Sequence, residues 1–180
     1  MLRITVPGND LWDDKEERFI PVKSQTLQLE HSLISLSKWE SKWHKPFLNK
    51  KDKTVEEVVD YIRCMTLTQN VDPNIYKCLT EDNIQEINEY IENPMSATYI
   101  SNTGENGIGK EQITAELIYY WMIALQIPVE FQKWHLNRLI TLIKVCNIKN
   151  TPPKKRSRGE ILRSNAALNA QRRKQLNTKG

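Results

Sequence analysis

The paired prolines at Pro152 and Pro153 divide this chain more sharply than any other feature of its sequence. Two prolines in succession end a helix and favour an extended linker. The charge changes sign at the same place. Residues 151–180 hold nine of the 26 Lys and Arg and one of the 22 Asp and Glu, a charge of +8. The remaining 17 basic and 21 acidic residues leave positions 1–150 at −4, so we expect an acidic body and a basic C-terminal arm.

The composition is that of a folded protein. Hydrophobic residues make up 39% and charged residues 27% of 180 residues, enough for one ordinary domain and an appendage. Cys64, Cys78 and Cys146 lack CxxC spacing, which indicates free thiols in a reducing compartment. No signal pattern opens the chain, and the longest apolar run, Leu117–Leu125, is about half the length that crosses a bilayer. We therefore expect a cytosolic protein without a membrane partner.

Residues 1–26 are predicted to form a small N-terminal β element. Leu2, Ile4 and Val6 alternate with polar residues, which is the period of a half-buried strand. A turn cluster at 7–10 follows, and residues 19–22 form a second short extended run.

Residues 27–150 are predicted to form a single helical body, which makes the fold mainly α. The apolar period changes near Leu27 and predicts a first helix that ends near Lys45. A capping box at Thr54–Glu57 starts the next helix, and Thr80 starts another that ends at 93–94. The positions expected to face the core of these helices are Leu29, Leu33, Leu36, Trp39, Trp43, Phe47, Val55, Val58, Val59, Ile62, Met65, Ile84, Ile87 and Ile91.

The second half of the body contains the most apolar segments. We expect helices at Glu111–Leu125 and Val129–Ile148, separated by Ile127 and Pro128, and a short connection of this kind favours an antiparallel hairpin. A short extended stretch is possible at 97–100. Residues 151–180 form the proline linker and a basic arm that is either helical or disordered.

Four tryptophans are candidate partner-binding residues. Trp39 and Trp43 stand four apart on one predicted helix, and Trp121 and Trp134 flank the break between the last two, so all four can meet in one aromatic cluster. Burial in the core is the commoner role of such residues. The alternative is an exposed groove that receives a partner helix.

The basic arm is the second candidate partner-binding segment. It contains no aromatic residue, which removes the stacking expected of a protein that binds single-stranded nucleic acid. Nucleic acid is kept as an alternative, but we favour an acidic or amphipathic protein surface as the complement. The cations chosen as candidates are Lys154, Lys155, Arg156, Arg158, Arg172 and Arg173.

No catalytic, cofactor or metal site is predicted. The run Gly104–Glu111 has the glycine and lysine spacing of a phosphate-binding loop but ends in Glu111, where that motif needs Ser or Thr for magnesium. His31, His44 and His135 are expected in different helices without a second ligand nearby, so a zinc site has little support. We therefore expect a protein that binds rather than an enzyme.

Two stretches resemble proteins encoded in the tail modules of long-tailed bacteriophages. The first is residues 113–146, ITAELIYYWMIALQIPVEF followed by QKWHLNRLITLIKVC. The second runs from PPKKRS at 152–157 to NAALNAQRR at 165–173, and residues 27–48 add weaker support. On these segments the chain resembles the tail assembly chaperones.

The resemblance implies a non-enzymatic factor of the host cytoplasm. Such a factor binds the long, apolar, helical tape-measure protein and helps the tail-tube protein to polymerise around it. Self-association stays open. The alternatives are a virion structural protein, such as a connector or a minor head or tail component, and a nucleic-acid-binding protein that uses the arm.

Overall fold

The computed structural model describes residues 1–14, 16–49, 53–98, 112–152 and 158–177. The chain divides into two compact units, Met1–Asn147 and Ile148–Gly180. Among the described residues there are six α-helices, two short 3-10 helices and two antiparallel two-stranded sheets. The prediction of a mainly α fold is therefore confirmed.

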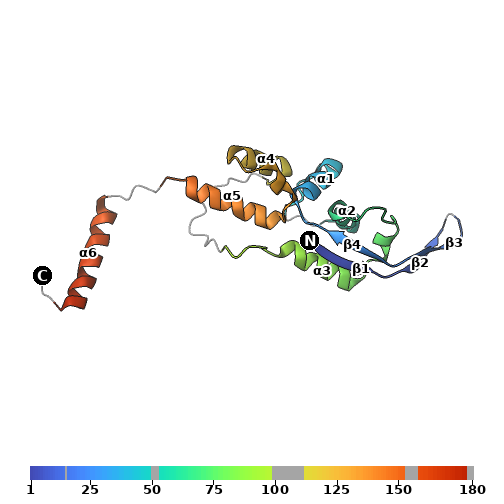
Figure 1. Cartoon of the computed structure of the whole chain (residues 1–180), viewed down its shortest axis with the longest axis horizontal. Helices are drawn as coiled ribbons and strands as arrows, with labels where there is room; N and C mark the ends of the chain where they lie inside the picture. The colour runs from blue at the N-terminus through green and yellow to red at the C-terminus, as the bar shows by residue number, and fades with distance from the viewer. Residues whose placement is uncertain (15, 50–52, 99–111, 153–157, 178–180) are drawn as a thin grey trace. The chain divides into compact units, whose positions relative to one another are not determined.

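Four strands form the N-terminal element (Figure 1). They are β1 (Leu2–Val6), β2 (Asn9–Asp13), β3 (Arg18–Val22) and β4 (Gln25–Leu29). Strand β1 pairs with β4 and β2 pairs with β3, both antiparallel. Gly8 lies where the two sheets meet, and a Cβ atom there would stand 2.6 Å from the Val22 carbonyl oxygen. Only glycine fits this close approach.

Strand β4 corrects the prediction that a helix begins near Leu27. Leu27 and Leu29 are both fully buried in β4, and the first helix, α1, spans Leu33–Trp43. Leu27 and Leu29 are two residues apart, which is the period of a strand, but Leu29 also stands four residues before Leu33, which is helical spacing, so the local pattern was ambiguous. Pairing decides it, because the backbone of β4 bonds to β1 along its length and Leu67 N donates to the Gln28 carbonyl.

Helices α1, α2 (Val55–Met65) and α3 (Glu81–Glu92) each start at a reciprocal capping box, and the 3-10 helix η1 spans Ile75–Cys78. The capping box predicted at Thr54 and the helix start predicted at Thr80 are both formed. Val55 was expected to face the core but is 82% exposed. It occupies the first position of α2, one turn before the helix reaches the core.

The two helices predicted in the second half of the body are both present in shorter form, but the predicted antiparallel hairpin between them is wrong. Helix α4 spans Ala115–Ala124, the 3-10 helix η2 spans Val129–Lys133, and α5 spans Leu136–Asn150. The backbone of α4 approaches α1 most closely, and η2 also packs on α1. The first residues of the predicted second helix therefore form the separate 3-10 helix η2. As a result, α4 and η2 both pack on α1.

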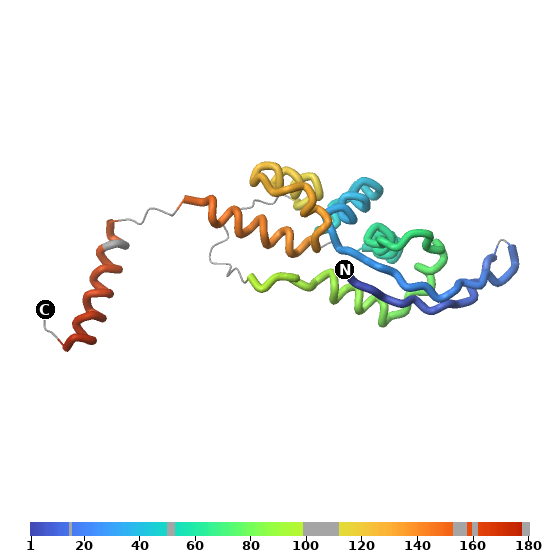
Figure 2. Tube along the Cα trace, viewed as in Figure 1, coloured from blue at the N-terminus to red at the C-terminus, as the bar shows by residue number. Residues whose placement is uncertain are grey.

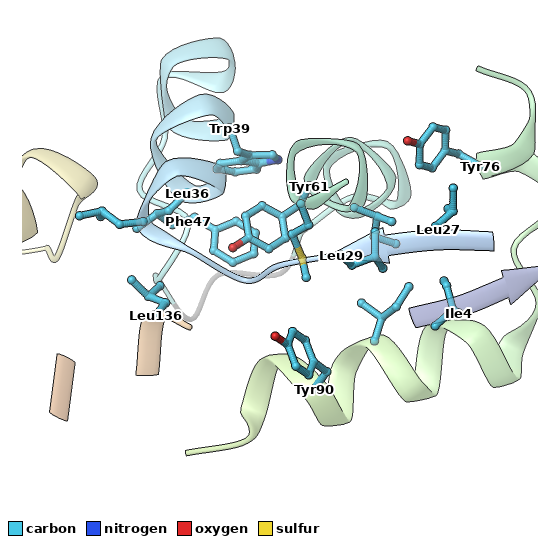
Figure 3. Close-up of a cluster of buried hydrophobic side chains, with 14 of the residues drawn as sticks. Ile4, Leu27, Leu29, Leu36, Trp39, Phe47, Tyr61, Tyr76, Tyr90 and Leu136 are labelled. Carbon is cyan, nitrogen blue, oxygen red and sulfur yellow. The ribbon is translucent and has the colours of Figure 1, made fainter. Parts of the chain in front are cut away.

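The core gathers around the β1–β4 pair. This pair lies between α3 on one side and α1 with α2 on the other (Figures 1 and 3). Figure 2 traces the same path from the blue N-terminal strands to the orange α5. In the second unit, α6 (Arg158–Leu176) is a basic helix. The largest fully buried side chains are Trp39, Tyr61, Leu27, Leu29, Leu33, Leu36, Ile62, Met65, Ile75, Ile87, Ile118 and Leu136.

Candidate protein-binding surfaces

Trp39 and Trp43 belong to the junction of α1 with α2. Trp39 is 1% exposed, and its indole Nε1 donates to the Glu57 carbonyl at 2.9 Å. The Trp43 indole donates to Asp60 Oδ2 at 2.8 Å and stacks on Trp39 with ring centroids 6.0 Å apart. Both indole N–H groups are used within the fold. Trp39 is thus a core residue, and the partly buried Trp43 packs against it at the edge of the core.

Trp121 and Trp134 do not join that pair. Trp134 stacks on Phe131 with centroids 4.0 Å apart, and the Arg138 guanidinium lies 4.2 Å from its ring. Trp121 is half-buried on α4. Among the described residues, no ring contact connects either of them to the aromatic group on α1. The single four-tryptophan cluster considered from the sequence is therefore not formed.

Two ion pairs fasten the α1–α2 junction. Lys42 binds Asp60, and Lys45 binds Glu57. The Lys45 hydrogen bond lowers the pKa of Glu57. Burial alone would raise the pKa of Asp60, but hydrogen bonds from Lys42 and the neighbouring indole hold it below its ordinary value. These charges are used in holding two helices together.

Glu40 connects α1 to the start of α4. Its Oε2 accepts the Ala115 backbone N–H at 2.7 Å, and its Oε1 accepts the Phe47 N–H at 2.9 Å. Burial raises the pKa of this carboxyl, and the two N–H groups partly offset that effect. A carboxylate at a helix N-terminus satisfies free backbone donors. Glu40 therefore fixes where α4 leaves the core.

A buried histidine pair lies between α2, α3 and α5. The rings of His31 and His135 have centroids 5.1 Å apart, and both side chains are buried. Tyr61 Oη and His31 Nδ1 share a hydrogen bond of 2.6 Å, and His135 Nε2 donates to the Tyr90 carbonyl at 3.0 Å. His135 Nδ1 has no hydrogen-bond partner among the described residues. Burial, and secondarily the neighbouring histidine, lowers the pKa of His31 to about 3.

These histidines stand outside helices, contrary to the expectation from the sequence. His31 follows β4, His135 precedes α5, and His44 is the left-handed C-cap of α1. Within the described part of the chain, no group of three or more His, Cys, Asp or Glu side chains is placed to hold a metal ion. The glycine-rich run at 104–111 falls outside the described residues.

Helix α4 presents an apolar face to solvent. Tyr120 is 64% exposed and Ile123 is 77% exposed, and Val129 of η2 is also exposed. Glu116 is the one charged residue of α4. The Tyr119 hydroxyl donates to Gln132 Oε1 at 2.9 Å and ties α4 to η2. The sequence indicated an apolar helix here, but it did not indicate which residues point outward.

Helix α3 presents an acidic face. Five of its carboxylates are exposed, and residues 80–98 contain no Lys, Arg or His. None of the five forms an ion pair with another described residue. The sequence already shows this run of carboxylates between the isoleucines that were predicted to face the core. The carboxylates are Glu81, Asp82, Glu86, Glu89 and Glu92.

The basic arm is described in part. Lys154, Lys155 and Arg156 lie outside the described residues. The other three candidate cations, Arg158, Arg172 and Arg173, are all exposed on α6. Exposed leucines accompany them at Leu162, Leu168 and Leu176.

Comparison of the chain with protein-family models, curated proteins and solved structures gave no match. No helix among the described residues is long and apolar enough to cross a membrane. The function is therefore inferred from the exposed faces of α3, α4 and α6.

Proposed function

We propose that this protein is a non-enzymatic assembly factor that binds an apolar helical segment of a partner through the exposed face of α4. In its specific form, the proposal is a tail assembly chaperone of a long-tailed bacteriophage. Its partner is then the tape-measure protein, and it acts in the host cytoplasm while the tail-tube protein assembles. The proposed function involves no catalytic activity and no cofactor.

The exposed apolar face of α4 is the observation that supports this proposal. A helix that is apolar on every side is normally buried on every side. Helix α4 instead buries Ile118 and Met122 while leaving Tyr120 and Ile123 in solvent. Apolar patches of this kind serve as contact surfaces for other proteins. A helical partner can lay its own apolar face against such a patch.

The way α4 is attached also suits a docking surface. Glu40 holds its N-terminus, and the Tyr119–Gln132 hydrogen bond holds it to η2. The exposed side chains therefore stand on a fixed helix, which reduces the ordering cost of binding. A long apolar helical chain would aggregate without cover, and a rigid apolar face of this kind can provide that cover.

Co-expression with the long helical protein that the proposal expects to be encoded beside this gene is the test. With the wild-type chain, we expect the long protein to remain soluble and to copurify. The double variant Tyr120→Gln, Ile123→Gln should lose copurification at least tenfold, because both substitutions remove apolar contact while keeping good helix formers. A long protein that is equally soluble without this chain contradicts the proposal.

The matched control replaces two exposed apolar residues elsewhere. Val55 and Leu67 are 82% and 55% exposed and lie outside α4. The variant Val55→Gln, Leu67→Gln should bind like the wild type. The protein content of purified phage particles is a second test. A chaperone should be absent from them, whereas stoichiometric presence of this chain favours the virion structural alternative.

Nucleic-acid binding through the arm is the second candidate, and it is supported by the exposed cations of α6. Its affinity should fall steeply with salt, because phosphate contacts release counterions. Deleting residues 154–180 should abolish it. A DNA affinity that survives this deletion removes the candidate.

A further inference from the structure

One face of the β2–β3 hairpin is exposed to solvent. Opposite residues of paired strands point to the same side, so Asp10 and Trp12 of β2 share a face with Pro21 and Phe19 of β3. All four are exposed, Trp12 to 53% and Phe19 to 65%. The two rings form an edge-to-face pair with centroids 5.0 Å apart. We call these four residues the aromatic face. Figures 1 and 2 show the hairpin extending beyond the β1–β4 pair.

The opposite face attaches the hairpin to the core. Val22 is 4% exposed, and Leu11 is partly buried against the core. At the base of the hairpin, the Ser24 hydroxyl donates to the Val6 carbonyl at 2.9 Å. A cross-strand aromatic pair adds some stability to a hairpin, but it does not require rings that point away from the core to stay exposed. The aromatic face therefore lies on a fixed support and is available to a partner.

Elsewhere in the protein, aromatic rings near the surface are covered by cations of the same chain. The pairs, with the cation 4.2 to 5.8 Å from the ring centroid, are Lys42 and Lys45 with Trp43, Lys53 with Phe47, Arg63 with Tyr76, and Arg138 with Trp134. Among the described residues, no cation lies over Trp12 or Phe19. A ring attracts a cation that lies within about 6 Å of its centroid. These two rings can therefore accept a cation from another molecule.

The hairpin is also acidic. Positions 9–22 contain five Asp and Glu against two Lys and Arg, a charge of −3. Arg18 lies 3.9 Å from Glu16, and both side chains are more than 60% exposed, so this pair contributes little. Asp10, Asp14 and Glu17 are exposed and form no ion pair with another residue that the structure describes. Carboxylates around an aromatic pair complement a cationic partner.

We propose that the aromatic face of the β2–β3 hairpin binds an arginine-rich segment of another protein. A guanidinium can stack on a ring and donate two hydrogen bonds to a carboxylate, whereas a lysine ammonium is a compact point charge. Asp10 stands two residues before Trp12 on the same strand face, about 7 Å away, so one bound arginine can contact both. The contact uses β2 and β3 and not α4, so it stands or falls separately from the proposed function.

Fluorescence anisotropy of labelled octa-arginine and octa-lysine peptides on the full chain tests the proposal. We expect the wild type to bind octa-arginine at least threefold more tightly than octa-lysine, because the peptides have equal charge and differ in stacking. Equal affinities overturn the proposal.

Two aromatic variants test the rings. The variant Trp12→Thr, Phe19→Thr keeps the charge and good strand formers and should bind octa-arginine at least tenfold more weakly. The variant Trp12→Tyr, Phe19→Tyr keeps an aromatic pair and should bind within threefold of the wild type. A threonine variant that keeps the amide protection of β2 and β3 and binds like the wild type overturns the proposal.

Two charge variants separate the hairpin from the rest of the acidic body. The variant Asp10→Asn, Glu17→Gln should weaken octa-arginine binding at least threefold, and it decides the question if the threonine variant loses the hairpin. The matched control Glu89→Gln, Glu92→Gln removes the same charge from exposed positions of α3 and should bind like the wild type. A hairpin charge variant that binds like the wild type, or a control that weakens binding as much, overturns the proposal.

The basic arm of this chain is a competing occupant that the same assay tests. The full-length variant Arg163→Gln, Arg172→Gln, Arg173→Gln removes three of its cations. If an arm, of the same chain or of a second copy, covered the aromatic face, this variant would bind octa-arginine more tightly, and the gain would vanish when Trp12→Thr and Phe19→Thr are added. We expect no gain that depends on the two rings. A gain that does depend on them overturns the assignment to another protein.

Discussion

Helices α3 and α4 have similar lengths and opposite surfaces. Both pack one face against the core, with Ile87 and Ile118 buried at their centres. On the outward side α3 shows five carboxylates, whereas α4 shows Tyr120 and Ile123. Packing requires only the inward residues, so the outward residues are free to serve other purposes. The difference gives one support two chemically distinct surfaces, one acidic and one largely apolar.

The largest expected effect tests whether the inward faces are equivalent. Ile87→Ala and Ile118→Ala should each lower the free energy of unfolding by about 2–5 kcal/mol, because each removes a fully buried side chain and leaves a cavity. Urea unfolding measures both. The outward variants Glu89→Gln and Tyr120→Gln serve as controls and should stay within about 0.5 kcal/mol of the wild type. A large loss from either control would break the comparison.

Acid should weaken the support of α3 in particular. The folded-state pKa of His31 is lowered to about 3, below its ordinary 6.5, and the pKa of His135 is also lowered by burial. The unfolded chain therefore binds more protons as pH falls below 6.5, and stability declines. Between pH 7 and pH 5 the His31 contribution alone is roughly 2 kcal/mol. Glu40 acts in the opposite direction, because its folded pKa is raised.

Unfolding midpoints and amide exchange across this pH range check the effect of acid. His135 holds the Tyr90 carbonyl of α3, so amides of α3 should lose protection before those of α4. The variant His44→Asn should keep the same pH profile, because His44 is a helix cap outside the buried pair. Stability that rises on acidification to pH 5 is the contrary result.

The smallest expected effect separates the two ways of holding a helix start. Thr80 caps α3 locally and its hydroxyl accepts the Asn83 N–H, so Thr80→Ala should cost about 1 kcal/mol. Glu40 caps α4 from another helix, and Glu40→Gln keeps one acceptor while removing the charge and the second acceptor. Amide exchange should show local loosening of α3 in the first variant and of α4 in the second. Identical exchange patterns would show that the caps are not independent.

The sequence by itself determined those features that depend on neighbours along the chain. The alternation of Leu2, Ile4 and Val6 predicted a strand, and the side chains of Thr54 and Thr80 predicted helix starts. Capping and alternation are local, because the interacting groups lie within a few residues of each other. The acidic body and the basic arm also follow from counting charges.

Only the tertiary structure decided the features in which distant segments compete. Leu29 has strand spacing with Leu27 and helical spacing with Leu33, and the pairing of β1 with β4 decides between them. The four tryptophans divide because α4 packs on α1 at a place fixed by Glu40, a contact 75 residues apart in sequence. The outward direction of Tyr120 arises the same way, since exposure depends on which neighbours cover a side chain and no local pattern records that.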